Sequence, residues 1–162
     1  MSAIEVAGLD HIVLRVKDLE KSIAWYRSVL GGRVERLLPG MGLVQMRLGA
    51  SLIDLVDVGG PVGKAGGAAP GVKRRNLEHF CVQLTEFDER RISAHLKRKG
   101  VVAGPTARRY GALGHGPSMY LTDPDGNTVE LKGPPEADQT EHVENAIWPG
   151  RRRAKSLERW RG

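Results

Sequence analysis

The sequence contains one pattern twice, and this repeat restricts the fold more than any other feature of the chain. Each half opens with an acidic residue and a histidine at the head of an aliphatic run, Leu9–Val16 in the first half and Leu77–Leu84 in the second. Each run leads into an amphipathic helical pattern that ends on glycine, and each half closes on a carboxylate between two aliphatic residues. We therefore expect two half-sized repeats that share one core, rather than two independent domains.

The first half predicts a strand, a helix and three further strands. Residues 10–16 alternate and are rich in β-branched and aliphatic side chains, which is typical of a strand. Asp18 is the expected N-cap of the helix that follows, and Gly31 begins the glycine pair expected to end it. The three later strands are predicted at Arg33–Leu37, Leu43–Leu48 and Ser51–Val58.

The second half predicts the same order of elements. A basic helix is expected over about Asp88–Lys99, and strands over Ser118–Thr122 and Asn127–Leu131. The glycine-rich segment Arg109–Gly116 predicts a loop near a cavity mouth, and Asp123–Gly126 (Asp-Pro-Asp-Gly) predicts a tight turn. The predicted fold class is α+β, with paired βαβββ modules that form a half-open barrel around a metal cavity.

Shifts in composition suggest where these modules begin and end. We expect one domain over residues 9–135, with an N-terminal lead (1–8), a first module (9–60), a Gly/Ala/Pro-rich linker (61–74), a second module (75–135) and a C-terminal tail (136–162). A short helix is predicted in the tail, near Arg153–Trp160.

Charge and composition argue against several classes of protein. The formal net charge is +6, but much of the excess lies at the extreme C-terminus, where a solvated or partner-docking tail is expected rather than a nucleic-acid surface. No apolar run approaches the length of a membrane span, and the N-terminus lacks the pattern of a secretory signal. The single cysteine, Cys81, excludes an internal disulfide and suits a reducing cytosol, so a cytoplasmic location is expected.

The repeat places four side chains that can bind metal at equivalent positions. His11 and His79 open the two halves, and Asp54 and Glu130 stand between aliphatic residues near their ends. Strand alternation puts these residues on the faces away from the helices, where they would line a cavity. A carboxylate such as Glu130 is costly to bury without a cation or donors, so the set predicts one divalent metal ion. Asp54 has the shorter side chain, so three roles stay open for it: direct ligation of the metal ion, binding to the metal ion through a water molecule, or exposure to solvent.

Three further residues are candidates for a role in the site. One could act in acid–base catalysis, and two could bind the substrate through a hydroxyl. His115 lies in the glycine-rich segment, where a mobile imidazole would act as acid or base, unless the segment is a plain connector. Ser118 and Tyr120 share one strand face and can offer hydroxyls to a substrate oxygen.

Other residues are candidates for lining the cavity. Arg15 lies on the face of the first histidine and is the stronger candidate for binding an anionic substrate, ahead of the pair Arg108-Arg109. Cys81 and Gln83 follow the second histidine on its own strand face and are predicted to contact substrate, with Cys81 more typical of a small apolar residue than of a ligand.

Together these motifs resemble those of the vicinal oxygen chelate superfamily, which includes glyoxalases, bleomycin resistance proteins and extradiol dioxygenases. The resemblance covers roughly residues 8–133 and is most specific at Ser118–Glu130 (SMYLTDPDGNTVE). It implies paired βαβββ modules around a metal ion, with both histidines and Glu130 at the family's ligand positions and Asp54 as a candidate fourth ligand. It also implies a homodimer that acts on a small molecule.

The resemblance leaves three functions open. An extradiol-type dioxygenase is slightly favoured, with Fe²⁺ on the two histidines and Glu130, Tyr120 bonding a substrate oxygen and His115 moving protons. However, His115 lies closer to Tyr120 than the corresponding histidine does in those enzymes. A glyoxalase I-type lyase, isomerase or epimerase would hold Mn²⁺, Ni²⁺, Co²⁺ or Zn²⁺, with Asp54 completing the ligand set. The third function is a metal-free, drug-sequestering protein similar to bleomycin resistance proteins.

Overall fold

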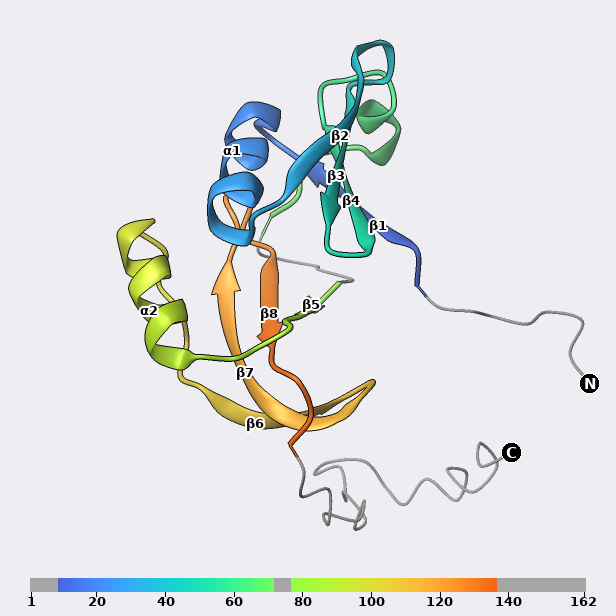
Figure 1. Cartoon of the computed structure of the whole chain (residues 1–162). Helices are drawn as coiled ribbons and strands as arrows, with labels where there is room; N and C mark the ends of the chain where they lie inside the picture. Colours follow the sequence, from blue (N-terminus) through green and yellow to red (C-terminus); the bar gives the residue numbers. More distant parts are fainter. Residues whose placement is uncertain (1–8, 72–76, 137–162) are drawn as a thin grey trace, which may run out of the picture.

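Each half of the chain forms one four-stranded sheet and one α-helix in the computed structural model, which describes residues 9–71 and 77–136 (Figure 1). The first half contains β1 (His11–Val16), α1 (Leu19–Leu30), β2 (Arg33–Leu38), β3 (Leu43–Leu48) and β4 (Ser51–Asp57). The second half contains β5 (His79–Gln83), α2 (Glu89–Arg98), β6 (Ala107–Gly111), β7 (Gly114–Thr122) and β8 (Thr128–Lys132). The predicted pair of βαβββ modules is confirmed.

The two sheets have the same strand order, β1-β4-β3-β2 in the first sheet and β5-β8-β7-β6 in the second. In each sheet the first strand runs parallel to the last, and the other pairs are antiparallel. Within the described residues, β1 and β5 are therefore edge strands. The register aligns Val13 with Asp54 and Cys81 with Glu130, so the two carboxylates occupy equivalent positions.

Helix α1 begins and ends where the sequence predicts. The side chain of Asp18 accepts a hydrogen bond from the backbone N–H of Lys21, and Gly31 takes the left-handed conformation (φ 70°) that ends the helix. The helix covers the face of the first sheet that carries Leu14 and Val16, and both residues are buried. The opposite, open face is left for the polar residues of the strands.

The prediction of a loop at Arg109–Gly116 is wrong, because β6 and β7 pair as a hairpin through this segment. Its glycines allow close packing instead of a flexible loop. A Cβ atom on Gly111 would lie 2.5 Å from Cε of Lys132, and one on Gly116 would lie 2.5 Å from the carbonyl oxygen of Pro134. Composition alone does not distinguish a glycine-rich hairpin from a glycine-rich loop.

Other predicted segments lie partly or wholly outside the described residues. The predicted linker contains a short 3-10 helix at Gly63–Gly66. The N-terminal lead (1–8) and the predicted helix near Arg153–Trp160 lie outside the described residues. In the part of the chain that the structure covers, no helix is long and apolar enough to cross a membrane.

The turn between β7 and β8 joins the second module to α1 of the first. Asp123 accepts hydrogen bonds within its own turn and a further one, 2.8 Å long, from the buried hydroxyl of Tyr26. Asp125 accepts from the backbone N–H of Lys17 at 3.0 Å and from the hydroxyl of Ser22 at 3.2 Å. The carboxylate of Asp125 is favourable at this position because it lies at the N-terminus of α1, and the N-terminus of a helix carries partial positive charge.

Tyr26→Phe is expected to lower the free energy of unfolding by about 1–3 kcal/mol, since a buried carboxylate loses one donor. Chemical denaturation of both proteins measures this difference. Tyr110→Phe is the matched control, because Tyr110 is 69% exposed, and it should change stability by less than about 0.5 kcal/mol. Equal effects of the two substitutions would contradict a structural role for the Tyr26 hydroxyl.

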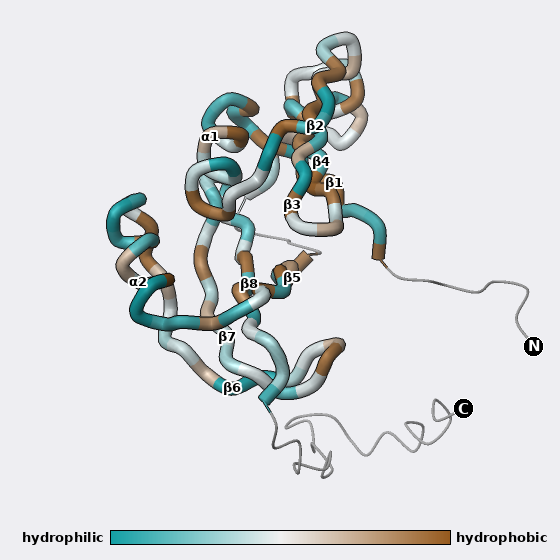
Figure 2. Tube along the Cα trace, viewed as in Figure 1, coloured by the Kyte–Doolittle hydropathy of each residue, from teal (hydrophilic) through white to brown (hydrophobic). Residues whose placement is uncertain are grey.

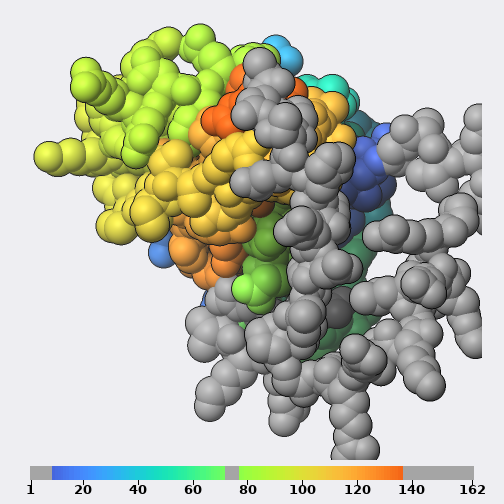
Figure 3. Space-filling view, turned by 90° about the horizontal axis from the view of Figure 1, so that it is seen from below, coloured from blue at the N-terminus to red at the C-terminus, as the bar shows by residue number. Residues whose placement is uncertain are grey.

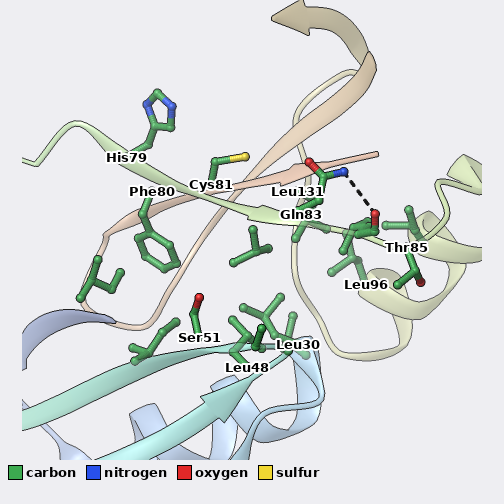
Figure 4. Close-up of a pocket in the computed structure, with 18 of the residues that line it drawn as sticks. Leu30, Leu48, Ser51, His79, Phe80, Cys81, Gln83, Thr85, Leu96 and Leu131 are labelled. Atoms are coloured by element: carbon green, nitrogen blue, oxygen red, sulfur yellow. Dashed lines mark hydrogen bonds between the residues drawn. The ribbon is translucent and has the colours of Figure 1, made fainter. Parts of the chain in front are cut away.

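The helix-covered faces of both sheets contribute to one apolar core. Hydrophilic residues predominate along α2, whose Leu96 is nevertheless buried in this core (Figure 2). A cleft of about 1300 Å³ lies between the modules, along β5 and α2. In it, Phe80 points toward Leu30 and Leu48 of the first module, whereas His79 lies on the other side of β5 (Figure 4).

Candidate functional site

The second module places His79 beside Glu130 on its open face. Nε2 of His79 lies 3.3 Å from Oε2 of Glu130, and the carboxylate is almost fully buried. Oε1 of Glu130 is buried without a hydrogen-bond partner among the described residues. A buried carboxylate oxygen without a donor is costly, so this position calls for a cation or for a donor from another molecule.

The first module places His11 near Asp54 on its own open face. Nδ1 of His11 donates to Oδ1 of Asp10 at 2.6 Å, and this hydrogen bond, with the nearby charge of Asp54, raises the pKa of His11. Because the carboxylate of Asp10 engages Nδ1, Nε2 is the nitrogen left for a ligand. A carboxylate on the second nitrogen is the common way in which proteins orient a histidine that binds metal.

A hydrogen-bond chain fixes the carboxylate of Asp54. Oδ2 of Asp54 accepts from Nε2 of Gln45 at 2.9 Å, and Oε1 of Gln45 accepts from Nη1 of Arg36 at 3.0 Å. Arg36 thereby sets the orientation of the Gln45 amide. The other oxygen of Asp54, Oδ1, is buried and has no partner among the described residues. Asp54 thus matches Glu130, with one oxygen held and one left open.

The four predicted ligands occur in one chain as two pairs. We define the first half-site as His11 and Asp54, and the second half-site as His79 and Glu130. Across residues 9–71 and 77–136, no three His, Cys, Asp or Glu side chains lie close enough together to hold a metal ion. His79 lies on the opposite side of β5 from Phe80 (Figure 4). The donor set of each half nevertheless fits a divalent metal ion.

Tyr120 lies beside the second half-site, and the predicted role of Tyr120 and Ser118 in substrate binding stays a prediction. Tyr120 lies opposite Glu130 in the register, and its ring meets that of His79 edge-on at 5.4 Å between centroids. Ser118 is fully buried, and its hydroxyl accepts a hydrogen bond from Arg109. Tyr120 is therefore the closer of the two to the second half-site.

Cys81 lies directly opposite Glu130 on the neighbouring strand. Desolvation, followed by the negative charge of Glu130, raises the pKa of the Cys81 thiol to about 11. An uncoordinated Cys81 thiol is therefore protonated at neutral pH. Gln83, two residues further on, donates to the carbonyl oxygens of Leu84 and Lys132, each at 3.2 Å.

Arg15 engages the linker in the structure. Its Nε, Nη1 and Nη2 donate to backbone carbonyl oxygens in the segment 63–68, at distances from 2.7 to 3.1 Å. This places the guanidinium against the linker and commits each of its three nitrogens to a hydrogen bond. The predicted role of Arg15 in substrate binding stays a prediction.

His115 lies in β7 and not in a mobile loop. It pairs with Tyr110 in the register, and the two rings lie 5.0 Å apart in an edge-on arrangement. Strand alternation puts His115 on the face opposite to Ser118 and Tyr120, and five residues along a strand separate it from Tyr120 by about 16 Å. Its predicted catalytic role stays a prediction, because the structure brings it to neither half-site.

Sequence reasoning missed Gln45 and Arg36, and it ranked the pair Arg108-Arg109 below Arg15 as a candidate for binding an anion. Gln45 and Arg36 pair across β3 and β2 in line with Asp54, so the shared register is the signal that would have revealed them. Registers between strands cannot be read from residue alternation alone.

Comparison with known families gives one match over most of the described chain. The description Glyoxalase/Bleomycin resistance protein/Dioxygenase superfamily matches residues 8–131. Human mitochondrial methylmalonyl-CoA epimerase is 28% identical over 130 residues, which cover 76% of this chain and 72% of that protein. Glyoxalase domain-containing protein RDO1 of Mycosarcoma maydis is 32% identical over 130 residues, covering 79% of this chain and 69% of that protein.

Solved structures show the same arrangement of elements. An integron cassette protein from the mobile metagenome of V. Pseudocholerae has a TM-score of 0.63 and 26% identity, covering 82% of this chain and 98% of that one. The fosfomycin resistance protein FosX from Listeria monocytogenes has a TM-score of 0.58 and 22% identity, covering 80% and 94%. The second likeness shows the fold alone.

Proposed function

Since this chain belongs to the glyoxalase, bleomycin resistance protein and dioxygenase superfamily, we propose that it is a divalent-metal-dependent lyase, isomerase or epimerase. Its substrate is a small molecule with two adjacent oxygens. The observation that carries this proposal is the pair of buried carboxylates, Asp54 and Glu130, each with one oxygen that lacks a partner among the described residues. Two histidines and two carboxylates make a set of four protein ligands.

The four ligands favour this class over an extradiol-type dioxygenase. The dioxygenases of the superfamily use two histidines and one glutamate, whereas here a hydrogen-bond chain from Arg36 through Gln45 also positions Asp54. When bound, a divalent ion would act as a Lewis acid on the adjacent oxygens of the substrate. Asp10 orients one ligand, His11. Tyr120, beside His79, would donate a hydrogen bond to a substrate oxygen.

We also propose that the complete site forms between two copies of the chain. Each copy presents both half-sites on open sheet faces, and its edge strands β1 and β5 each lack a second neighbour within the described residues. A two-fold dimer that brings β1 of one copy to β5 of the other would unite the first half-site with the partner's second half-site. Symmetry then gives two equal sites in each dimer.

The names of three similar proteins suggest which reaction to test first. Methylmalonyl-CoA epimerases are named for inversion at a carbon next to a carbonyl group, which requires removal and return of a proton. A carboxylate or a hydroxyl beside the bound substrate can move such a proton. We propose Glu130 and Tyr120 for this proton transfer, because Tyr120 lies opposite Glu130 in the register and its ring contacts that of His79.

Proton exchange with solvent tests the proposed class directly. We expect the protein loaded with Mn²⁺, Co²⁺ or Ni²⁺ to introduce deuterium from D₂O at the carbon next to a carbonyl group, as detected by NMR. The metal-free protein should not do so. The two substrates to test are methylmalonyl-CoA and the hemithioacetal that glutathione forms with a 2-oxoaldehyde. The parallel assay follows oxygen consumption with catechols after anaerobic loading with Fe²⁺. Oxygen uptake without deuterium exchange would replace the proposed class by a dioxygenase.

A further inference from the structure

We propose that the open face of the second sheet carries a subsite for an oxyanion group of the substrate, a carboxylate or a phosphate-like group, centred on Arg109. This inference rests on the proposed function only in assuming that the same substrate reaches the second half-site. It names a class of substrate: small molecules that carry an anionic group beyond their pair of adjacent oxygens.

Arg109 is held in place by one end of its guanidinium. Nη1 donates to the hydroxyl of Ser118 at 2.9 Å and to its carbonyl oxygen at 3.1 Å, and Cζ lies 4.5 Å from the centre of the Tyr120 ring. Nε and Nη2 make no hydrogen bond with the described residues. A planar guanidinium fixed in this way offers its remaining donors to an oxyanion with little further loss of side-chain freedom.

Lys132 adds a second cationic group beneath Arg109. Its side chain is buried, and Nζ donates to the carbonyl oxygen of Arg109 at 2.6 Å and to that of Gly116 at 3.4 Å. Within the described residues, neither Arg109 nor Lys132 forms an ion pair with a carboxylate. Two cations outside any such ion pair can attract an anionic ligand, although the carboxylate of Glu130 stands two residues from Lys132 on the same face of β8.

The subsite adjoins the second half-site. The ring of Tyr120 contacts His79 through one edge and lies under Arg109, so a single aromatic ring separates the imidazole from the guanidinium. Part of the second module reaches the surface in Figure 3, and the side chains of Arg109 and Tyr120 are each partly exposed. A small substrate can therefore reach the half-site with its adjacent oxygens and Arg109 with its anionic group.

Arg108 is a matched control on the same strand. It precedes Arg109 in β6, so its side chain leaves the opposite face of the strand, and its Nε lies 2.8 Å from Oε2 of Glu136. Removing Arg108 lowers the net charge as much as removing Arg109. Only the removal of Arg109 would remove the proposed subsite.

The test is calorimetric titration of the full-length, metal-free protein with inorganic phosphate and, separately, with malonate. Arg109→Gln is expected to weaken binding of the preferred probe by about 10–100-fold, the loss typical of charge-assisted hydrogen bonds. Arg108→Gln should change binding by less than about twofold. Lys132→Met should also weaken binding, and Arg109→Lys should restore only part of the affinity. The preferred probe shows whether a tetrahedral or a planar oxyanion fits.

The outcomes separate this inference from the proposed function. Mn²⁺ affinity is measured on the same variants and should not change on Arg109→Gln, because Arg109 is not a ligand. Binding of a probe that depends on Arg109 supports the subsite even if Mn²⁺ does not bind. If the wild-type protein binds neither probe more tightly than Arg109→Gln does, or if Arg108→Gln weakens binding equally, the inference is overturned.

Discussion

A mixture of His11→Ala and His79→Ala chains is expected to bind metal, although neither variant binds it tightly alone. Each variant lacks one histidine from every site of its own homodimer. In a mixed dimer, the intact His11 of one copy and the intact His79 of the other meet in one complete site, while the second site loses both. If the chains pair at random, half of the dimers are mixed, so the metal content should recover to about a quarter of the wild-type value.

The measurement is elemental analysis after co-expression of the two variants, with each variant expressed alone for comparison. A double variant, His11→Ala with His79→Ala in one chain, co-expressed with the wild type is the control for subunit exchange. Its mixed dimers have no complete site, because each site lacks one histidine. Absence of metal in the co-expressed pair, with dimers present, would place the complete site within a single chain.

Asp54→Ala is expected to lower the affinity for Mn²⁺ by more than about 100-fold and to abolish proton exchange, because it removes a ligand. Gln45→Leu should have a smaller effect, about 10–100-fold, since it removes only the donor that orients Asp54. This graded pair distinguishes a direct ligand from a residue that merely occupies the sheet face. The two affinities are measured by competition with a chelator of known strength.

Asp57→Ala is the control in the same strand. Asp57 ends β4 and accepts a hydrogen bond from the backbone N–H of Gly59, so its loss should leave metal affinity within about twofold of wild type. Unchanged affinity in Asp54→Ala would leave three ligands, two histidines and Glu130. That result would favour the dioxygenase chemistry that the sequence resemblance places slightly ahead.

Much of each module could be predicted from the sequence, because local signals act within a module. The Asp18 cap, the Gly31 terminator and the alternation along β1 lie within a few residues of the structure that they specify. Residue alternation also predicts which face of each strand lies under a helix. The β6–β7 hairpin could not be predicted, since Gly116 is required by a close contact with the backbone of Pro134, a residue distant in the sequence.

The arrangement of the two modules could not be predicted for a related reason. Equivalent positions in a repeat show which residues correspond, but they do not show whether corresponding residues meet within one chain. That depends on which surfaces pack, and here the turn at Asp123 and Asp125 attaches to α1. The motif that most strongly indicated a family is therefore, in part, a structural joint between the modules.

Among residues 9–71 and 77–136, β5 has no strand on its outer edge, and this has a consequence for the solubility of a lone copy. Natural sheets protect exposed edges with lysine, proline or a bulge, yet His79–Gln83 contains neither a charged residue nor a proline. Such an edge is a template on which another extended chain can add. Substitutions that weaken pairing between copies should therefore appear first as precipitation at high protein concentration, before any loss of the fold within each module.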